Sequence, residues 1–151
     1  MNISFFALGG LAPMKTALAL VTVFALAVVS AGANPQAEDP KGLEFFTKNI
    51  QPVLEAKCFK CHSKDSKKLK GKLRLDNKED SLKGGDTGPA IVPKDPTKSL
   101  AYVAITYKND DLQMPPEEED KLSADQIKKF EEWIKMGAPG LKPKADVDKK
   151  K

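Results

Sequence analysis

Three stretches of the chain place apolar residues at the spacing of a helix face. In the first stretch the intervals are three, four, three and one residues, and the stripe consists of Leu43, Phe46, Ile50, Val53 and Leu54. Such intervals bring side chains to one side of an α-helix. Pro52 lies inside this stretch, and since proline has no backbone N–H, we expect it to kink the helix or divide it in two.

The second helical stretch follows Asp95-Pro96. Aspartate before proline is typical of an N-cap with proline at the first helical position. The apolar face of this predicted helix consists of Leu100, Val103, Ala104 and Tyr107.

The third stretch begins with Ser123 and Gln126, which have the spacing of a capping box. Its apolar residues are Ile127, Phe130, Trp133 and Ile134, and Gly137 followed by Pro139 marks its end. We interpret Phe130 and Trp133 as core residues that pack against Phe46 and Ile50 of the first helix.

The segments between these stretches read as long loops. Residues 63–72 are polar and rich in lysine, residues 84–96 are rich in glycine and proline, and Pro115-Pro116 ends regular structure after Met114. No segment alternates like a strand, so the predicted fold class is all-α with long loops. Residues 141–151 have no apolar periodicity, and we expect them to form a Lys-rich disordered tail.

The first 33 residues have the features of an export signal. Lys15 is their only charge, residues 17–29 are apolar except for Thr22, and Ala31 and Ala33 form an A-x-A site. A basic residue, an apolar run of 13 residues and small residues at a cleavage site together indicate a secretory signal peptide. The run is shorter than the ~20 residues of a transmembrane helix.

The expected organisation is therefore a signal peptide over residues 1–33, one domain over residues 34–140 and the tail over residues 141–151. Met14 directly precedes Lys15, so the true start of the signal lies at Met14 if residues 1–13 are not translated. The alternative is an uncleaved membrane anchor, which is the one case in which we expect contact with a membrane. Export places the domain in the periplasm or an equivalent extracytoplasmic compartment.

Composition narrows the classes of function. The chain has 151 residues, of which 40% are hydrophobic, and a net charge of +4. Arg74 is the only arginine among 25 basic residues, which argues against a nucleic-acid partner, because base and phosphate recognition favours arginine. Two cysteines and one histidine exclude a disulfide scaffold and a four-ligand zinc site of cysteine and histidine.

The two cysteines and the histidine lie together as Cys58-Phe59-Lys60-Cys61-His62. C-x-x-C-H is the attachment signature of c-type haem. About one helical turn separates the two thiols, which lets them reach two vinyl groups of one porphyrin, and His62 then faces the iron. The motif predicts one haem c, bound covalently through Cys58 and Cys61, with His62 as an iron ligand.

Other uses of this motif fit the sequence less well. A redox dithiol of the thioredoxin type follows a strand, whereas this motif follows a helical stripe. A structural disulfide in an exported protein leaves the adjacent His62 unexplained.

A low-spin haem needs a sixth ligand, and the chain offers no second histidine. After residue 33 the methionines are Met114, in a loop stiffened by two prolines, and Met136, at the end of the last predicted helix. We expect Met114 to be the ligand, because His/Met ligation is usual for cytochromes c and a stiff loop can hold a thioether in place. The alternative uses are core filling by Met114 and packing at the helix end by Met136.

The sequence resembles the class I cytochrome c superfamily, and within it the planctomycete-type cytochrome c domain, over about residues 43–139. The matching segments are Phe45-Phe46, Ile50, Pro52-Val53-Leu54, Cys58, Lys60-Cys61-His62, Leu73-Arg74-Leu75-Asp76, residues 84–96, Ser99-Leu100, residues 111–116, Leu122-Ser123, Ile127 and residues 133–139. The combination of C-x-x-C-H with M-P-P and W-I-K-x-G-A-P is highly specific. The resemblance implies a small all-α fold of three to five short helices and long loops around one haem, with His62 and Met114 as axial ligands.

We therefore expect a single-haem, exported one-electron carrier and not an enzyme. The expected partners are redox proteins, and a role as a subunit of a larger dehydrogenase or oxidase is compatible with this function. The main alternative is a haem peroxidase or a ligand-binding haem sensor in which the sixth ligand is displaced. A non-haem module that uses Cys58 and Cys61 as a dithiol is a further alternative.

Two further hypotheses concern the surroundings of the haem. Arg74 is a candidate partner of a haem propionate, since guanidinium binds carboxylate in a bidentate fork; the alternative is an ordinary surface arginine. Lysines flank the C-x-x-C-H motif and acids flank Met114, which indicates either two solvated loops or a dipolar surface that orients docking on a redox partner.

Overall fold

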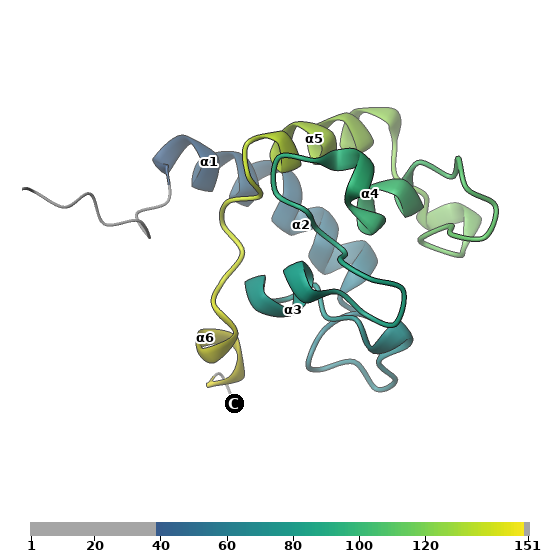
Figure 1. Cartoon of the computed structure of the whole chain (residues 1–151), viewed down its shortest axis with the longest axis horizontal. Helices are drawn as coiled ribbons and strands as arrows, with labels where there is room; N and C mark the ends of the chain where they lie inside the picture. Colours follow the sequence, from purple (N-terminus) through teal and green to yellow (C-terminus); the bar gives the residue numbers. More distant parts are fainter. Residues whose placement is uncertain (1–38, 150–151) are drawn as a thin grey trace, which may run out of the picture. The chain divides into compact units, whose positions relative to one another are not determined.

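The computed structural model describes residues 39–149. The chain divides into two units, Met1–Ala33 and Asn34–Lys151, and all described residues belong to the second. The predicted signal peptide lies outside the described residues. Within residues 39–149 short helices alternate with long loops, there is no strand, and an isolated antiparallel bridge joins Gly85 to Gly88 (Figure 1). In the same range no helix has the length and hydrophobicity that crossing a membrane requires.

The first helical stretch is one continuous run and is not divided at Pro52. It consists of α1 (Pro40–Phe45), the π-helical segment η1 (Phe46–Ile50), α2 (Gln51–Val53) and the π-helical segment η2 (Leu54–Cys58). Pro52 cannot donate a hydrogen bond within the helix. The turn before it widens instead, and Gln51 N–H donates to the carbonyl of Phe46 five residues back. A widened turn thus absorbs the expected kink without ending the helix.

The middle of the chain contains a helix that the apolar pattern did not predict. After the short 3-10 turn η3 (Lys70–Lys72), α3 spans Lys78–Lys83. Asn77 caps α3, since its Oδ1 accepts a hydrogen bond from Asp80 N–H at 2.8 Å. Gly84 ends the helix at φ +78°, a backbone region that glycine adopts without strain.

The second predicted helix begins later than expected. Asp95 caps only the 3-10 turn η4 (Pro96–Lys98), through a hydrogen bond from Lys98 N–H at 3.2 Å. Ser99 interrupts the helical path with extended backbone angles, and α4 follows over Leu100–Ile105. A further 3-10 turn, η5 (Glu118–Asp120), lies in the acidic loop after Met114.

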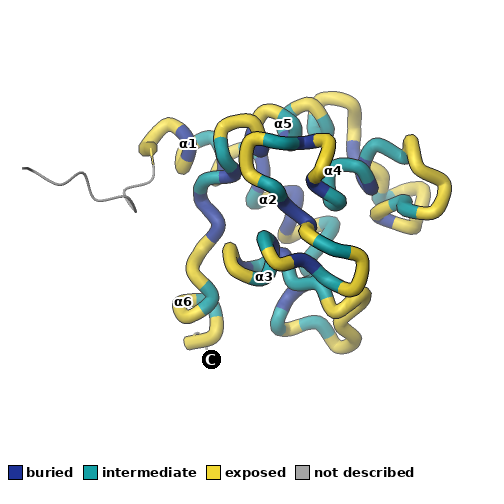
Figure 2. The backbone as a smooth tube through the Cα atoms, in the orientation of Figure 1, coloured by how far each residue is buried: buried dark blue, intermediate teal, exposed yellow. Residues whose placement is uncertain are grey.

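The predicted last helix is confirmed, as α5 (Ala124–Lys135) with both hydrogen bonds of the capping box between Ser123 and Gln126. Its packing against the first helix is also confirmed, because α5 contacts η1 and the rings of Trp133 and Phe46 lie 5.8 Å apart. The indole N–H of Trp133 donates to the carbonyl of Pro139 at 2.8 Å, which holds the chain after the helix against it. Buried residues gather where the first helical run, α4 and α5 meet (Figure 2).

The segment after α5 is not the disordered tail that its composition suggested. Leu141 is buried in the core, and α6 spans Lys144–Asp148 beside α3. Two of its charged side chains, Lys144 and Asp148, have partners at Asp80 and Arg74, so charges that looked like those of a solvated tail hold the segment in place. The folded domain therefore extends beyond the expected boundary at residue 140.

Candidate functional site

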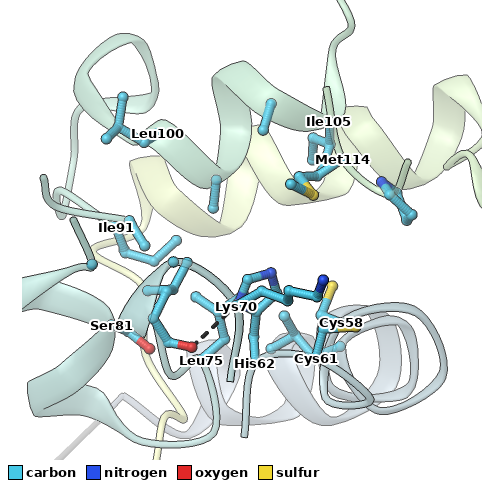
Figure 3. Close-up of a pocket in the computed structure, with 18 of the residues that line it drawn as sticks. Cys58, Cys61, His62, Lys70, Leu75, Ser81, Ile91, Leu100, Ile105 and Met114 are labelled. Atoms are coloured by element: carbon cyan, nitrogen blue, oxygen red, sulfur yellow. Dashed lines mark hydrogen bonds between the residues drawn. The ribbon is translucent and has the colours of Figure 1, made fainter. Parts of the chain in front are cut away.

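A cavity of about 430 Å³ opens at the centre of the domain. Figure 3 shows α4 and the loop with Met114 on one side, and the segment from Cys58 to Leu75 on the other. The lining is mainly apolar and includes Leu54, Leu73, Leu75, Ala90, Ile91, Leu100, Ala104, Ile105, Leu112, Phe130 and Trp133. The volume and the apolar lining are those of a site for a small molecule or a cofactor.

The cysteines and the histidine lie together on one wall of this cavity (Figure 3). Cys58 is the last residue of η2, and a turn follows in which the N–H groups of Cys61 and His62 both donate to the carbonyl of Cys58, at 3.1 and 2.9 Å. This turn brings both thiols and the imidazole to the cavity. The structure therefore assembles the three residues that the motif predicts to act together.

The ring of His62 is held by a backbone carbonyl. Its Nδ1 lies 3.2 Å from the carbonyl oxygen of Leu73. A carbonyl oxygen only accepts hydrogen bonds, so Nδ1 is the donor, and in the neutral ring the lone pair lies on Nε2. A histidine that ligates a metal through one nitrogen commonly donates to a carbonyl from the other.

The Cys58 thiol does not have the properties of a redox dithiol. Burial among apolar side chains raises its pKa to about 12, and the neighbouring Cys61 adds to this rise. Reactive C-x-x-C cysteines instead have a lowered pKa, because the thiolate is the nucleophile. Nor does a cysteine–zinc site fit, since the described residues contain no group of three or more His, Cys, Asp or Glu side chains placed to hold a metal ion.

Met114 faces His62 across the cavity, whereas Met136 is not among the lining residues (Figure 3). The backbone N–H of Met114 donates to the carbonyl of Ala104 at 3.2 Å, which ties the loop to the end of α4. The Met114 side chain is 39% exposed, so it forms part of the cavity's rim. Of the two methionines considered from the sequence, the structure brings Met114 opposite the histidine.

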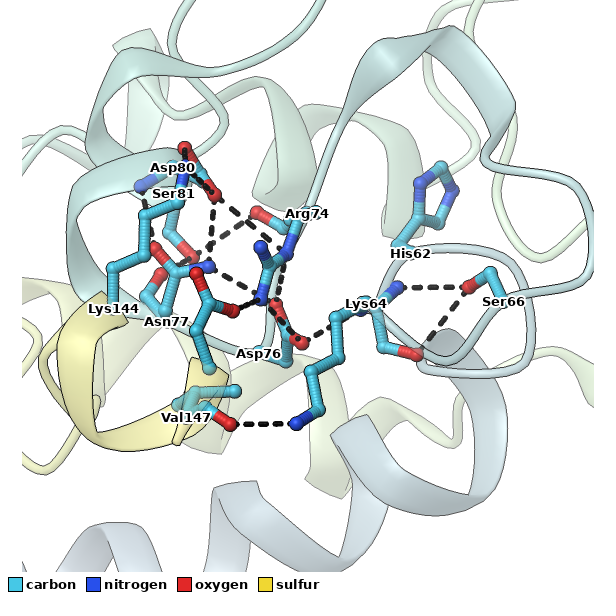
Figure 4. Close-up of polar contacts among 12 residues, drawn as sticks. His62, Lys64, Ser66, Arg74, Asp76, Asn77, Asp80, Ser81, Lys144 and Val147 are labelled. Atoms are coloured by element: carbon cyan, nitrogen blue, oxygen red, sulfur yellow. Dashed lines mark hydrogen bonds and ion pairs between the residues drawn. The ribbon is translucent and has the colours of Figure 1, made fainter. Parts of the chain in front are cut away.

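Arg74 does not line the cavity, and its guanidinium binds carboxylates of the protein itself (Figure 4). It contacts Asp76 through Nε at 2.9 Å, Asp148 through Nη2 at 2.9 Å and Asp80 at 3.6 Å. The structure thus corrects the expectation that Arg74 faces a propionate, because three nearer carboxylates occupy its donors. The Arg74 side chain is 14% exposed and is a structural residue here.

Lysine supplies the positive charge at the cavity instead. The charged lining residues, apart from His62, are Lys57 and Lys70. The ammonium of Lys57 donates to Asp120 at 2.7 Å, while Lys70 lies in η3 with its backbone N–H on the carbonyl of Cys61. Lys70 could not be identified from the sequence, because nothing in the polar segment 63–72 distinguishes one lysine from the next.

Phe130 and Trp133 belong to both the core and the site. They pack edge to face with ring centroids 5.8 Å apart, and both also line the cavity. From the sequence we predicted that they belong to the core alone. Their double role follows from the small size of the domain, in which the wall of the cavity and the core are one layer of side chains.

Comparison with known families agrees with this site. Residues 58–118 match the family model described as planctomycete cytochrome C. The matched segment begins at Cys58, includes His62 and Met114, and is shorter than the resemblance over residues 43–139. No curated protein and no solved structure matches the chain. The family match agrees with the expected planctomycete-type cytochrome c domain over residues 58–118, and the helical architecture confirms the small all-α fold.

Proposed function

We propose that the protein, which carries a planctomycete-type cytochrome c domain over residues 58–118, is a single-haem, one-electron carrier with His62 and Met114 as axial ligands. One observation carries this proposal. His62 and Met114 face each other across an apolar cavity, and both cysteines of C-x-x-C-H lie on the histidine side.

The residues around the cavity fit a covalently bound haem. The thiols of Cys58 and Cys61 would each add across a vinyl group, with the sulfur bonding to one carbon and the thiol hydrogen passing to the other. His62 offers the free lone pair of Nε2, and Met114 offers a thioether from the opposite side. Lys70 is the charged lining residue best placed to neutralise a propionate.

The bound iron would supply a single exchange between the ferrous and ferric states. The protein's part is to shield the haem from water and to hold its ligands in place. Water is excluded from the cavity by the apolar side chains of Ile91, Phe130 and Trp133, which lower the local dielectric constant. The Leu73 carbonyl fixes the orientation of the His62 ring. Ligands on both sides leave no open position for oxygen chemistry, which favours a carrier over an enzyme.

The exposure of Met114 supports one alternative. A ligand that is 39% exposed on a loop is easier to displace than a buried one, and displacement would open a position for peroxide or a small gas. A haem peroxidase or a ligand-binding sensor is therefore the second candidate function, and the test below distinguishes it from the carrier.

The test is the visible spectrum, oxidised and reduced, of protein produced in a host that matures c-type haem. The variants are Met114→Ala and, as a matched control, Met136→Ala. We expect a covalent low-spin haem with a weak far-red sulfur-to-iron band, which Met114→Ala abolishes and Met136→Ala leaves intact. A high-spin wild-type spectrum would favour the peroxidase or sensor, and a colourless protein would overturn the proposal.

Redox partner proteins, including a larger dehydrogenase or oxidase, are part of the same proposal. The lysines around C-x-x-C-H and the acids after Met114 support oriented docking, and the ion pair between Lys57 and Asp120 joins the two charged regions. Such docking predicts electron transfer that slows as ionic strength rises. Export is supported by the sequence of residues 1–33, and N-terminal sequencing of the secreted protein would test it.

A further inference from the structure

The proposed iron ligand His62 lies in the turn after η2, and a segment eleven residues further along holds it in place. Segment 73–76 runs beside the backbone of residues 62–64. Leu75 N–H donates to the carbonyl of His62 at 2.8 Å, and Lys64 N–H donates to Asp76 Oδ2 at 2.7 Å. The Leu73 carbonyl accepts from the His62 ring. Both the backbone and the ring of His62 therefore depend on where segment 73–76 lies.

Segment 73–76 belongs to no helix or strand, so its position depends on side chains. Arg74 forms a two-pronged contact with Asp76, through Nε to Oδ1 at 2.9 Å and through Nη2 to Oδ2 at 3.1 Å. The side chains of Arg74 and Asp76 are only 14% and 8% exposed. Charge-assisted pairs of this kind are stronger than neutral hydrogen bonds and fix geometry as well.

The last described residues of the chain close over this pair. We call residues 142–148, which include α6, the C-terminal clasp. Asp148 reaches Arg74 Nη2 at 2.9 Å, and Lys144 Nζ reaches Asp80 at 3.0 Å (Figure 4). The carbonyl of Val147 accepts from Lys64 Nζ at 2.7 Å.

Two backbone contacts fasten the clasp to α3 as well. The carbonyl of Lys142 accepts from Lys78 N–H at 2.9 Å, and Lys144 N–H donates to Glu79 Oε2 at 2.7 Å. The clasp thus contacts both segments that pair beside His62. It contacts Lys64 in segment 62–64, and it contacts Arg74 in segment 73–76.

We propose that the C-terminal clasp and Arg74 are positioning elements for the iron ligand His62, acting through the carbonyl of Leu73. The inference rests on the proposed haem function. Arg74 touches neither His62 nor the cavity, and it acts by holding the segment that carries Leu73. Residues 142–148, whose sequence looks like a charged tail, then help to position the iron ligand.

The clasp should influence the iron because the hydrogen bond at Nδ1 sets how strongly the imidazole donates from Nε2. Groups beyond the direct ligands orient them and raise their basicity. A firmly held Leu73 carbonyl makes His62 a stronger donor, which favours ferric iron. Loosening the clasp should weaken that donor and raise the midpoint potential.

The test uses the haem-loaded protein and three variants. Asp148→Asn removes the charge that reaches Arg74, and a stop codon in place of Lys144 removes α6 entirely. The matched control is Asp146→Asn, which makes the same charge change in the same helix at an exposed residue for which the structure gives no side-chain contact. All comparisons are made at a temperature where each variant is fully folded.

Two measurements report on His62 directly: the exchange rate of its Nδ1 proton in the reduced protein, followed by NMR, and the midpoint potential. We expect exchange about threefold faster for Asp148→Asn, a modest effect because that carboxylate is partly exposed. Loss of α6 removes several contacts, and we expect exchange about tenfold faster. The potential should rise in the same order, and Asp146→Asn should match the wild type.

A truncated protein that folds and keeps the wild-type exchange rate and potential would overturn the proposal. If the truncated protein does not fold, Asp148→Asn decides alone, and equality with Asp146→Asn overturns it. The wild-type spectrum separates this outcome from failure of the proposed function. A low-spin His/Met haem with insensitive variants rejects the clasp only, whereas a protein without covalent haem rejects both.

Discussion

At the scale of single residues, the lysine at the cavity is the clearest case of chemistry that depends on the fold. Lys57 and Lys70 both line the cavity, but the ammonium of Lys57 is held by Asp120. Among residues 39–149, the ammonium of Lys70 has no hydrogen bond or ion pair. Lys70 is therefore able to meet the carboxylate of a bound cofactor, the role for which the sequence suggested Arg74.

We predict that Lys70→Gln lowers the midpoint potential of the haem-loaded protein, measured by redox titration at low ionic strength. A cation near the iron disfavours the ferric state, so its removal favours oxidation. Lys68→Gln is the control, because it removes the same charge from the same loop at a residue outside the lining. Equal shifts in both variants would show that only the net charge matters and that Lys70 has no specific place.

The cavity residues that the sequence singled out with a short motif, Cys58, Cys61 and His62, lie within about one turn of each other in the chain. Cys58, Cys61 and His62 could be predicted because two thiols and an imidazole at this spacing leave few other uses. The Leu73 carbonyl could not, since any residue has a carbonyl and only the folded path brings this one to the His62 ring. The predicted contact of Arg74 with a propionate was wrong, because a guanidinium binds a propionate and an aspartate equally well. In the folded chain its partner is the neighbouring carboxylate of Asp76.

At the scale of elements, the chain after α5 packs against the first helical run through a close approach of the backbone at Gly140. A Cβ at Gly140 would lie 2.4 Å from Cδ1 of Phe46. Gly140 also has φ +89°, where a side chain is strained. The chain after α5 therefore requires glycine at this position for two separate reasons.

Gly140→Ala should lower the free energy of unfolding by about 3 kcal/mol, from overlap with the Phe46 ring plus backbone strain. Gly137→Ala is the matched control, since Gly137 has φ +101° but a Cβ there would meet no atom within 4 Å. There we expect about 1 kcal/mol, from strain alone. Denaturant unfolding of the haem-loaded proteins measures both, and equal losses would contradict the proposed contact with Phe46.

The elements also show which sequence signals are sufficient. α5 could be predicted because its capping box, apolar stripe and terminal glycine agree. α3 was missed, although Asn77 before two acids and Gly84 after the helix are start and end signals, because it has few apolar residues to reveal a period. α6 was missed because its stabilising partners, Arg74 and Asp80, lie more than sixty residues earlier.

At the scale of the whole molecule, the functional site and the hydrophobic core are the same structure. Leu75, Ile91, Phe130 and Trp133 are buried core residues, and all four line the cavity. A domain of this size has little apolar surface to bury, so a large apolar group in the cavity would complete the core. We infer that loading the haem and folding the domain are coupled.

Two carboxylates beneath the C-terminal clasp, Asp76 and Asp80, give the molecule a second source of stability that depends on pH. Burial raises the pKa of Asp76, but hydrogen bonds from Arg74, Lys64 N–H and Asn77 outweigh it and hold the pKa below its usual value. Asp80 follows the same pattern, with burial opposed by Asn77 and Lys144. The two carboxylates therefore favour the folded state while they are ionised.

The sign of the effect on stability follows from these lowered pKa values. The contribution is fully present above the unfolded pKa of about 3.9, and it is lost as the pH falls through the lower folded value.

Asp76→Asn should therefore lower the free energy of unfolding at pH 7 and flatten its decline below about pH 4. Asp65→Asn, at an exposed loop residue, should keep the wild-type slope. Both variants carry the same haem, so the difference between them in acid unfolding isolates Asp76. A wild-type slope in Asp76→Asn would show that this carboxylate does not contribute to the pH dependence of stability.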